Sequence, residues 1–465
     1  MKGPARPVLP IIPHHFPRRI TSLSAPPFRI PKSAIRNSRT CIGKVRGLNS
    51  PLLSMRRSIP QLMFTILVLG LLLLREAQAP PLAGIEETFI NWLAANSNGE
   101  RQRAPLMLVE INDNCLMEYP WPWTPLNYAA FLDGSLQFHA RVAAIEPVLA
   151  WEKRNLTPDQ SLQQPQYAKL LHYRILQTPK LELGAELGFP EDPDVLPPMQ
   201  PLPVFRNVKG ATDAVPEYTV IEAEPGEDIR LTAALGFANV PTTEPVAQHA
   251  PLVFRYRGQV VPSFALEAMM LWYGVLPEDV EVHLGSDIRL GSKLTIPINQ
   301  AGAMLVDWKV PYDRAGFDDL ELAVDQLEHN HPPVIDPYQL KDRLLVLART
   351  DVQAQTMLLP SGRMGSTGEL LGAALATAET NAFARPAGLA GIAVVLLLGM
   401  ILGWVATERR KLWVAPVALG FGAAYLLLCL AVFEAIRVAL PLTPMLGLTV
   451  FVALFRLLAP IAPDR

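Results

Sequence analysis

Residues 106–149 read "LMLVEINDNCLMEYPWPWTPLNYAAFLDGSLQFHARVAAIEPVL", and this stretch decides the fold class. It begins with a mostly apolar run that ends in Asp113, as a buried strand with a polar tip does. Residues 141–149 predict a second buried strand. Between the two strands, apolar side chains recur at helical spacing from Tyr128 to Leu136. A strand, a helix and a strand within about forty residues predict an α/β domain with two parallel strands joined by a right-handed crossover.

The connection from the first strand to the helix contains "PWPW" at residues 120–123. Thr124 is a good N-cap, and Pro125 falls at the first helical position, where its missing donor costs nothing. Trp121 and Trp123 therefore lie near the carboxyl end of a strand, where open α/β sheets tend to bind ligands. Their rings either stack on a ligand or pack this corner against the sheet, and packing is the commoner role of buried aromatic residues.

Two acidic residues follow the two predicted strands. Asp113 ends the first strand, and Glu146 lies near the end of the second. If these strand ends are adjacent, the two carboxylates line a pocket that binds a cation or an amine. The alternative is that they cap helices or form surface ion pairs.

The sequence offers no catalytic or metal-binding pattern. The three cysteines, Cys41, Cys115 and Cys429, are far apart and have no metal-ligand spacing. His329 and His331 lie two apart, without a third ligand nearby. No nucleophile and base are paired by spacing. We therefore expect no catalytic residues, no metal, no cofactor and no enzymatic activity.

Charge is distributed unevenly along the chain. Residues 1–60 contain twelve Lys or Arg and no Asp or Glu, whereas the rest contains 29 basic and 43 acidic residues. A basic start and an acidic body suggest two compartments rather than a nucleic-acid binder. Residues 1–57 are rich in Pro, Ser and Arg, which predicts a disordered cytoplasmic tail. Alternatively, translation starts at Met55.

Four apolar segments are long enough, or nearly so, to cross about 30 Å of hydrocarbon. They predict transmembrane helices at residues 58–75, 387–406, 412–433 and 438–459. "AQA" at residues 77–79 resembles a signal-peptidase site, but Pro80 follows it directly. We therefore expect an uncleaved anchor.

Basic residues indicate how the predicted spans are oriented in the membrane. Arg56 and Arg57 place the start of the first span in the cytoplasm, and the basic residues of 408–411 return to the same side. Residues 76–385 then form an extracytoplasmic domain. Residues 460–465 end the chain as a short cytoplasmic tail.

The order of motifs in the outer domain resembles the type-two CHASE domain, an extracellular sensory domain of bacterial cyclases and kinases. That family has a strand ending in I-D-D, a W-P-W connection and a helix, then G-F-x-N, P-S-x-A and late strand motifs. The counterparts in this chain are Ile111–Asp113, Trp121–Trp123, Gly236–Asn239, Pro262–Ala265, "IPINQAGAMLVDW" at 296–308 and "LLVLART" at 344–350. Together with the four spans, the resemblance covers about residues 75–460.

The chain departs from this pattern at several positions. Tyr119 and Pro125 replace the glycine and arginine that flank W-P-W, and Ala348 replaces a late glycine. The usual aspartate after the second strand falls at Val148, with Glu146 as a nearby acid. In the resembling architecture an output domain follows the last span, but here only about six residues do.

The resemblance implies a sensor or receptor in the bacterial cell membrane that binds an unknown small molecule or envelope ligand. Without its own output domain, it would act through a separate signalling protein, and we expect a homodimer. A first alternative is a cell-envelope scaffold or assembly protein that keeps the fold without sensing. A second is a hydrolytic ectoenzyme, which the fold class permits but no residue pattern supports.

Overall fold

The computed structural model describes residues 80–149, 158–190, 198–199, 202–240, 245–388, 391–395, 397–399, 401, 414–447 and 449–450. The predicted tail, the first span, the alternative start and the final six residues lie outside these ranges. So do parts of the other three predicted spans.

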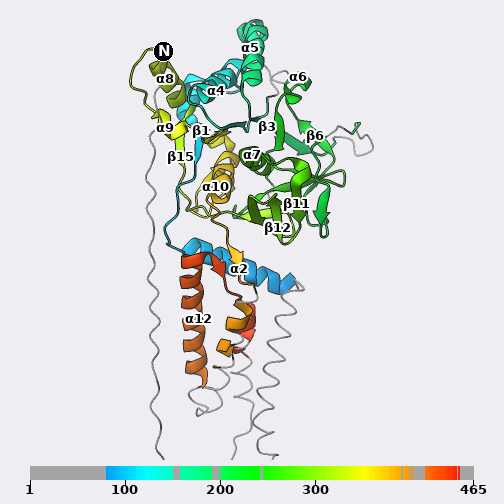
Figure 1. Cartoon of the computed structure of the whole chain (residues 1–465), viewed down its shortest axis with the longest axis vertical. Coiled ribbons are helices and arrows are strands. Elements are labelled where there is room, and N and C mark those ends of the chain that lie inside the picture. The colour runs from blue at the N-terminus through cyan, green and yellow to red at the C-terminus, as the bar shows by residue number, and fades with distance from the viewer. Residues whose placement is uncertain are drawn as a thin grey trace, which may run out of the picture. The chain divides into compact units, whose positions relative to one another are not determined.

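A seven-stranded sheet forms the centre of the predicted domain of residues 76–385 (Figure 1). Its path is β15-β1-β16-β2-β3-β6, and β7 also pairs with β3. The strands are β1 (Leu106–Ile111), β2 (Val142–Ile145), β3 (Leu181–Gly188), β6 (Val220–Ala223), β7 (Ala234–Phe237), β15 (Asp313–Gly316) and β16 (Leu344–Arg349). All pairings are parallel except that of β6 with β3.

The two strands predicted from residues 106–149 are present and point the same way, but they are not neighbours. β16, which comes about 200 residues later in the chain, lies between them and pairs with both. The condition of adjacent strand ends, on which the predicted pocket of Asp113 and Glu146 depends, is therefore not met. The reason is that β16 is a continuous apolar strand and takes the central place, where both faces are buried.

Helices cover both faces of the sheet. On one face lie α7 (Phe264–Tyr273) and α10 (Thr367–Glu379), which share a core with Leu108 and Val346. On the other lie α4 (Pro125–Gln137), α8 (Phe317–Glu328) and α5 (Pro158–Gln177), around Val109 and Leu347. Alternate residues of each strand point to opposite cores, as the pleat requires. This confirms an α/β domain.

Local sequence explains where the main helices begin and end. α4 starts after Thr124, whose N–H donates to the Asn127 side chain at 3.3 Å, and Pro125 is its first residue as predicted. α7 starts after Ser263, whose hydroxyl accepts from Leu266 N. It ends at Gly274, which has the left-handed conformation (φ 61°) that glycine adopts without cost.

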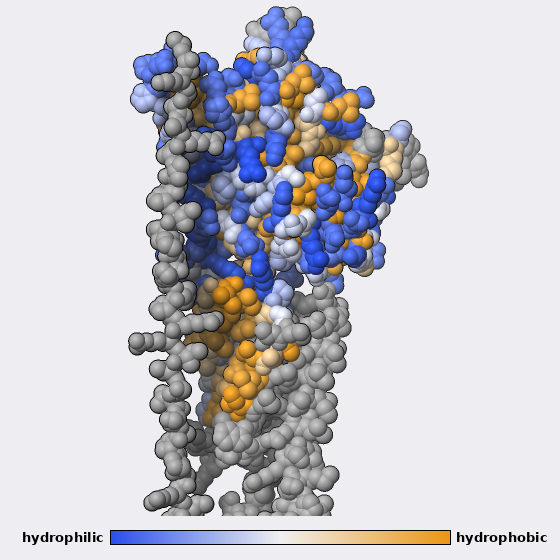
Figure 2. All heavy atoms as spheres, in the orientation of Figure 1, coloured by the Kyte–Doolittle hydropathy of each residue, from blue (hydrophilic) through white to orange (hydrophobic). Residues whose placement is uncertain are grey.

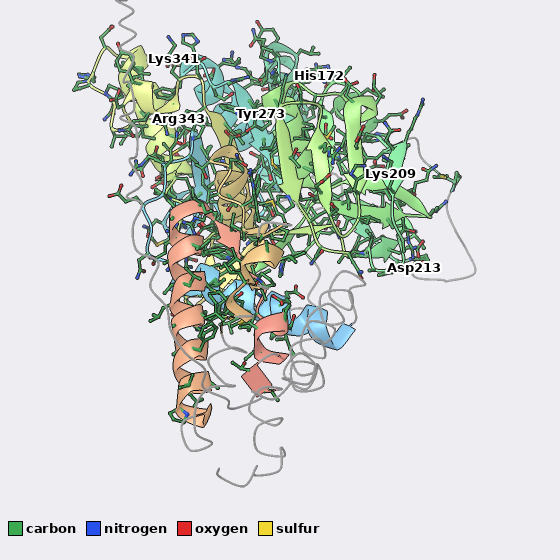
Figure 3. All side chains as sticks on the ribbon, turned by 60° about the horizontal axis from the view of Figure 1, so that its bottom comes forward. His172, Lys209, Asp213, Tyr273, Lys341 and Arg343 are labelled. Carbon is green, nitrogen blue, oxygen red and sulfur yellow. The ribbon has the colours of Figure 1, made fainter. Side chains whose placement is uncertain are left out.

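A strand-rich region adjoins the face covered by α7 and α10. It contains the sheets β10-β9-β5, β13-β12-β11-β4, β14-β8 and β17-β18. Their strands are β4 (Asn207–Lys209), β5 (Glu217–Tyr218), β8 (His249–Pro251), β9 (Val253–Tyr256), β10 (Gln259–Pro262), β11 (Val280–His283), β12 (Asp287–Leu290), β13 (Leu294–Pro297), β14 (Ala303–Leu305), β17 (Gln355–Leu358) and β18 (Met364–Ser366). In Figure 3, Lys209 and Asp213 mark this region, while Lys341 and Arg343 mark the opposite side near α8.

Short helices complete the connections of the domain. They are α3 (Asp113–Glu118), α6 (Glu227–Arg230), α9 (Pro337–Leu340) and the 3-10 turns η2 (Pro277–Asp279) and η3 (Val352–Ala354).

Two further helices lie next to the domain. α2 (Pro80–Asn96) precedes β1, and α12 (Val414–Ile436) overlaps the predicted third span. Among the residues that the structure describes, one helix, Pro416–Ile436, is long and apolar enough to cross a membrane. Figure 2 shows hydrophobic residues gathered on this part of the molecule. The short strands β19 (Arg385–Pro386) and β20 (Val438–Ala439) pair beside the end of α12.

Candidate functional site

The carboxyl ends of β1, β16 and β2 meet at one edge of the sheet, and the segment that leaves β16 connects them. The N–H of Arg349, the last residue of β16, donates to Glu146 Oε2 at 3.3 Å. Three residues later, the N–H of Val352 donates to Asp113 Oδ1 at 3.2 Å. The two predicted acids are thus held by one short segment, from opposite sides of β16.

The Arg349 side chain organises this edge. Its Nε and one terminal nitrogen donate to the two oxygens of Asp351, at 2.9 and 2.8 Å. Its guanidinium carbon lies 4.3 Å from the centre of the Trp121 ring. The Asp351 side chain is 0% exposed, and that of Arg349 is 21% exposed. A bidentate pair of this kind fixes the plane of the guanidinium, here against an aromatic face.

The two predicted tryptophans occupy different environments. Trp123 is 1% exposed, donates from Nε1 to Tyr119 O at 3.0 Å and packs 4.5 Å from Phe317. Trp121 is partly exposed and lies 6.4 Å from Trp123, ring centre to ring centre. "PWPW" is therefore the predicted strand-to-helix connection, with one ring inside the core and the other at the site.

Local geometry places the two acids. Asn112 caps α3 by accepting from Cys115 N at 2.9 Å, which puts Asp113 in the first turn, where the helix dipole favours a carboxylate. Near Glu146 the chain runs very close to β3. A Cβ added to Gly184 would lie 2.0 Å from the Glu146 carbonyl oxygen, so this position requires glycine.

The electrostatic environment is acidic. Burial raises the pKa of Glu146 to about 7, and the nearby Glu186 and Asp351 carboxylates add to the rise. The hydrogen bond from Arg349 N and the charge of Arg349 oppose it. Near neutral pH this carboxyl therefore exchanges its proton readily, and a positive charge close by would favour its ionised form.

Sequence reasoning missed Arg349 and Asp351. The strand "LLVLART" is recognisable, but its position between β1 and β2 is not, because strand order is a long-range property. The available signal is that a continuous apolar strand ends in Arg349 and is followed two residues later by Asp351, at the end of a strand where sites concentrate in parallel sheets. No three His, Cys, Asp or Glu side chains are grouped to hold a metal ion within the part of the chain that the structure describes.

A second pair of acids lies inside the domain, away from this edge. Glu182 on β3 is 0% exposed, and neither of its carboxyl oxygens has a hydrogen-bond partner. Burial and the charge of Glu267 on α7 raise the pKa of Glu182 well above its usual value. Burial also raises the pKa of Glu267 to about 7. In both carboxyls burial thus disfavours the ionised form.

Comparison with known proteins gives one match. The model of the CHASE2 domain matches residues 64–407, a range that contains the whole sheet and every residue of the site. No curated protein and no solved structure matches the chain.

Proposed function

Because this chain belongs to the CHASE2 family of extracellular sensory domains, we propose that it is a membrane-anchored sensor of an extracytoplasmic stimulus. The family match over residues 64–407 carries this proposal. The site at the carboxyl edge of β1, β16 and β2 is the place where we expect the stimulus to bind, since ligands of open parallel sheets bind at this edge.

We propose that the ligand carries a positive charge, such as an amine. The carboxylates of Asp113, Glu146 and Asp351 outnumber the one guanidinium of Arg349 at this edge. Trp121 supplies an aromatic face that already attracts a cation. An amine would compete with the Arg349 side chain for Asp351 and Trp121, and with the N–H groups of Arg349 and Val352 for Glu146 and Asp113. Binding thereby has a direct way to displace the end of β16.

The proposed topology has four spans, both termini in the cytoplasm and the domain of residues 76–385 outside a bacterial cell membrane. It requires α2, the exit of the domain near residue 386 and the end of α12 to share the outer side. Contacts among these segments support it. Asn98 N, just after α2, donates to Glu434 near the end of α12 at 2.9 Å, and Arg385 N donates to Arg437 O at 2.9 Å.

The signal would pass through the spans to a separate protein, and the sensor itself would not be an enzyme. We expect it to act as a homodimer. The competing function is that of a cell-envelope scaffold. The partners of a scaffold would bind the domain of residues 76–385 and not the spans.

Hydrogen exchange of the full-length protein in detergent tests the site. A panel of primary and quaternary amines is compared with carboxylic acids of equal size. An amine that binds should speed exchange at the N–H groups of Arg349 and Val352, because it takes the carboxylates of Glu146 and Asp113 to which they donate. This effect should disappear in Trp121→Ala. A change of exchange elsewhere alone would refute this site but not the sensor.

A further inference from the structure

α10 runs from the candidate site to the other end of the domain. Its first turn packs tightly on the end of β16, because a Cβ added to Gly368 would lie 2.6 Å from Ala348 Cβ and 2.9 Å from Arg349 O. Even a methyl group has no room there. A displacement of Arg349 would therefore move the start of α10.

Nine residues and about 14 Å further along the helix, Thr377 contacts the loop after β14. Its hydroxyl donates to Ala373 O at 2.7 Å and accepts from Asp307 N at 3.0 Å. Thr377 and Asp307 are both buried. The backbone of Asp307 is thus fixed to α10.

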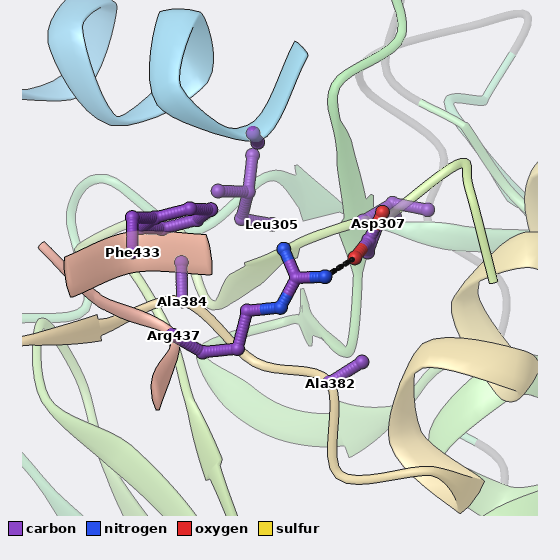
Figure 4. A pocket seen from close by; sticks show the side chains of 8 residues that line it. Leu305, Asp307, Ala382, Ala384, Phe433 and Arg437 are labelled. Atoms are coloured by element: carbon purple, nitrogen blue, oxygen red, sulfur yellow. Dashed lines mark ion pairs between the residues drawn. The ribbon is translucent and has the colours of Figure 1, made fainter. Parts of the chain in front are cut away.

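The Asp307 carboxylate joins two arginines from distant parts of the chain. Oδ2 lies 3.1 Å from Arg101 Nε. It also lies 3.4 Å from a terminal nitrogen of Arg437, the ion pair drawn in Figure 4. The side chains of Asp307 and Arg101 are 6% and 5% exposed. Both guanidinium groups also donate to the hydroxyl of Ser97, which directly follows α2, at 2.8 and 3.1 Å.

Arg437 directly follows α12 and has a left-handed backbone conformation (φ 58°), which is unusual for a residue other than glycine. Its carbonyl oxygen accepts from Arg385 N in the strand by which the domain continues beyond α10. A cavity of about 10 Å³ lies beside its side chain, enough for about one water molecule. Leu305 on β14, Phe433 on α12 and Ala384, which precedes β19, line this cavity.

We propose that α10 transmits the state of the candidate site to the outer end of α12, and that the Asp307–Arg437 ion pair is the contact through which it does so. The role of this route in signalling rests on the proposed sensor function. The coupling along α10 itself can be measured without a stimulus and without a partner protein. If α10 shifts Asp307, it separates a buried carboxylate from one of its two cations. The positions of Arg437 and of the β19–β20 pair must then adjust.

Hydrogen exchange of the full-length protein in detergent tests the route at two amides, Arg385 N–H and Ala387 N–H, which bond across β19–β20. Asp307→Asn keeps an acceptor for Lys309 N but removes the charge. Arg437→Gly removes the guanidinium and suits the left-handed backbone. Asp133→Asn is the matched control, since Asp133 forms a 2.9 Å ion pair with Arg174 far along the chain from this junction.

We expect each variant to speed exchange at both amides about tenfold, the effect of losing one charge-assisted hydrogen bond. The double variant should be no faster than the faster single variant, and β16 amides and the control should not change. Unchanged exchange in both single variants, or effects that multiply in the double variant, would overturn the proposal. If the β16 amides also exchange faster, the variant Arg437→Lys decides. A smaller increase in exchange rate that is limited to β19–β20 supports the ion pair, and an unchanged exchange rate contradicts it.

Discussion

The guanidinium of Arg349 lies 4.3 Å above the ring of Trp121 while both of its donating nitrogens bind the buried carboxylate of Asp351. One residue at the end of the central strand thereby fixes the connection after β1 and the segment after β16.

Asp351→Asn should destabilise the domain by about 2 kcal/mol, because Arg349 loses a charged, bidentate partner in a largely buried place. Thermal unfolding of the purified protein measures this. Asp133→Asn, which removes a more exposed ion pair, should cost less than about 1 kcal/mol. Equal losses in the two variants would show that the Arg349 pair has no special role.

The two tryptophans should differ in their effect on stability. Trp123→Ala removes a fully enclosed ring and should cost about 3–5 kcal/mol. Trp121→Ala removes a partly exposed ring and one cation contact, and should cost about 1 kcal/mol. Chemical denaturation of both variants compares them. A larger loss at Trp121 would mean that its ring belongs to the core.

Glu267→Gln should weaken the pH dependence of stability. The pKa of Glu267 is raised from 4.5 to about 7 in the folded protein, so its favourable contribution is complete below pH 4.5 and is lost as the pH rises to about 7. At pH 8 the variant should avoid a loss of unfolding free energy on the order of 3 kcal/mol. Unfolding midpoints of both proteins from pH 5 to pH 8 measure it. Parallel pH profiles would contradict this role.

Gly184→Ala should cost about 3 kcal/mol, since the new methyl group would overlap the Glu146 carbonyl oxygen and force β2 and β3 apart. Gly84→Ala is the control, because it places a methyl group on α2 with no atom within 4 Å. It should stabilise the protein by about 0.5–1 kcal/mol. Thermal unfolding compares the two, and a tolerated Gly184→Ala would refute the close approach.

The sequence predicts local structure well where the signals are local. β1, the cap at Thr124 and α4 follow from apolar spacing and capping residues. Strand order does not follow, because nothing near residue 111 or residue 145 indicates that β16 will separate them. Asp113, Trp121 and Glu146 could therefore be named as candidates. Arg349 and Asp351, which bring them together, became visible only in three dimensions.

The measurement that tests the sensor function most directly is affinity purification of the full-length protein from native membranes in mild detergent, with mass spectrometry of the proteins that accompany it. We predict a kinase, cyclase or other signalling protein, bound through the spans and weakened by Arg437→Gly. Recovery of envelope or secreted proteins alone, bound through the domain of residues 76–385, would contradict the sensor and favour a scaffold.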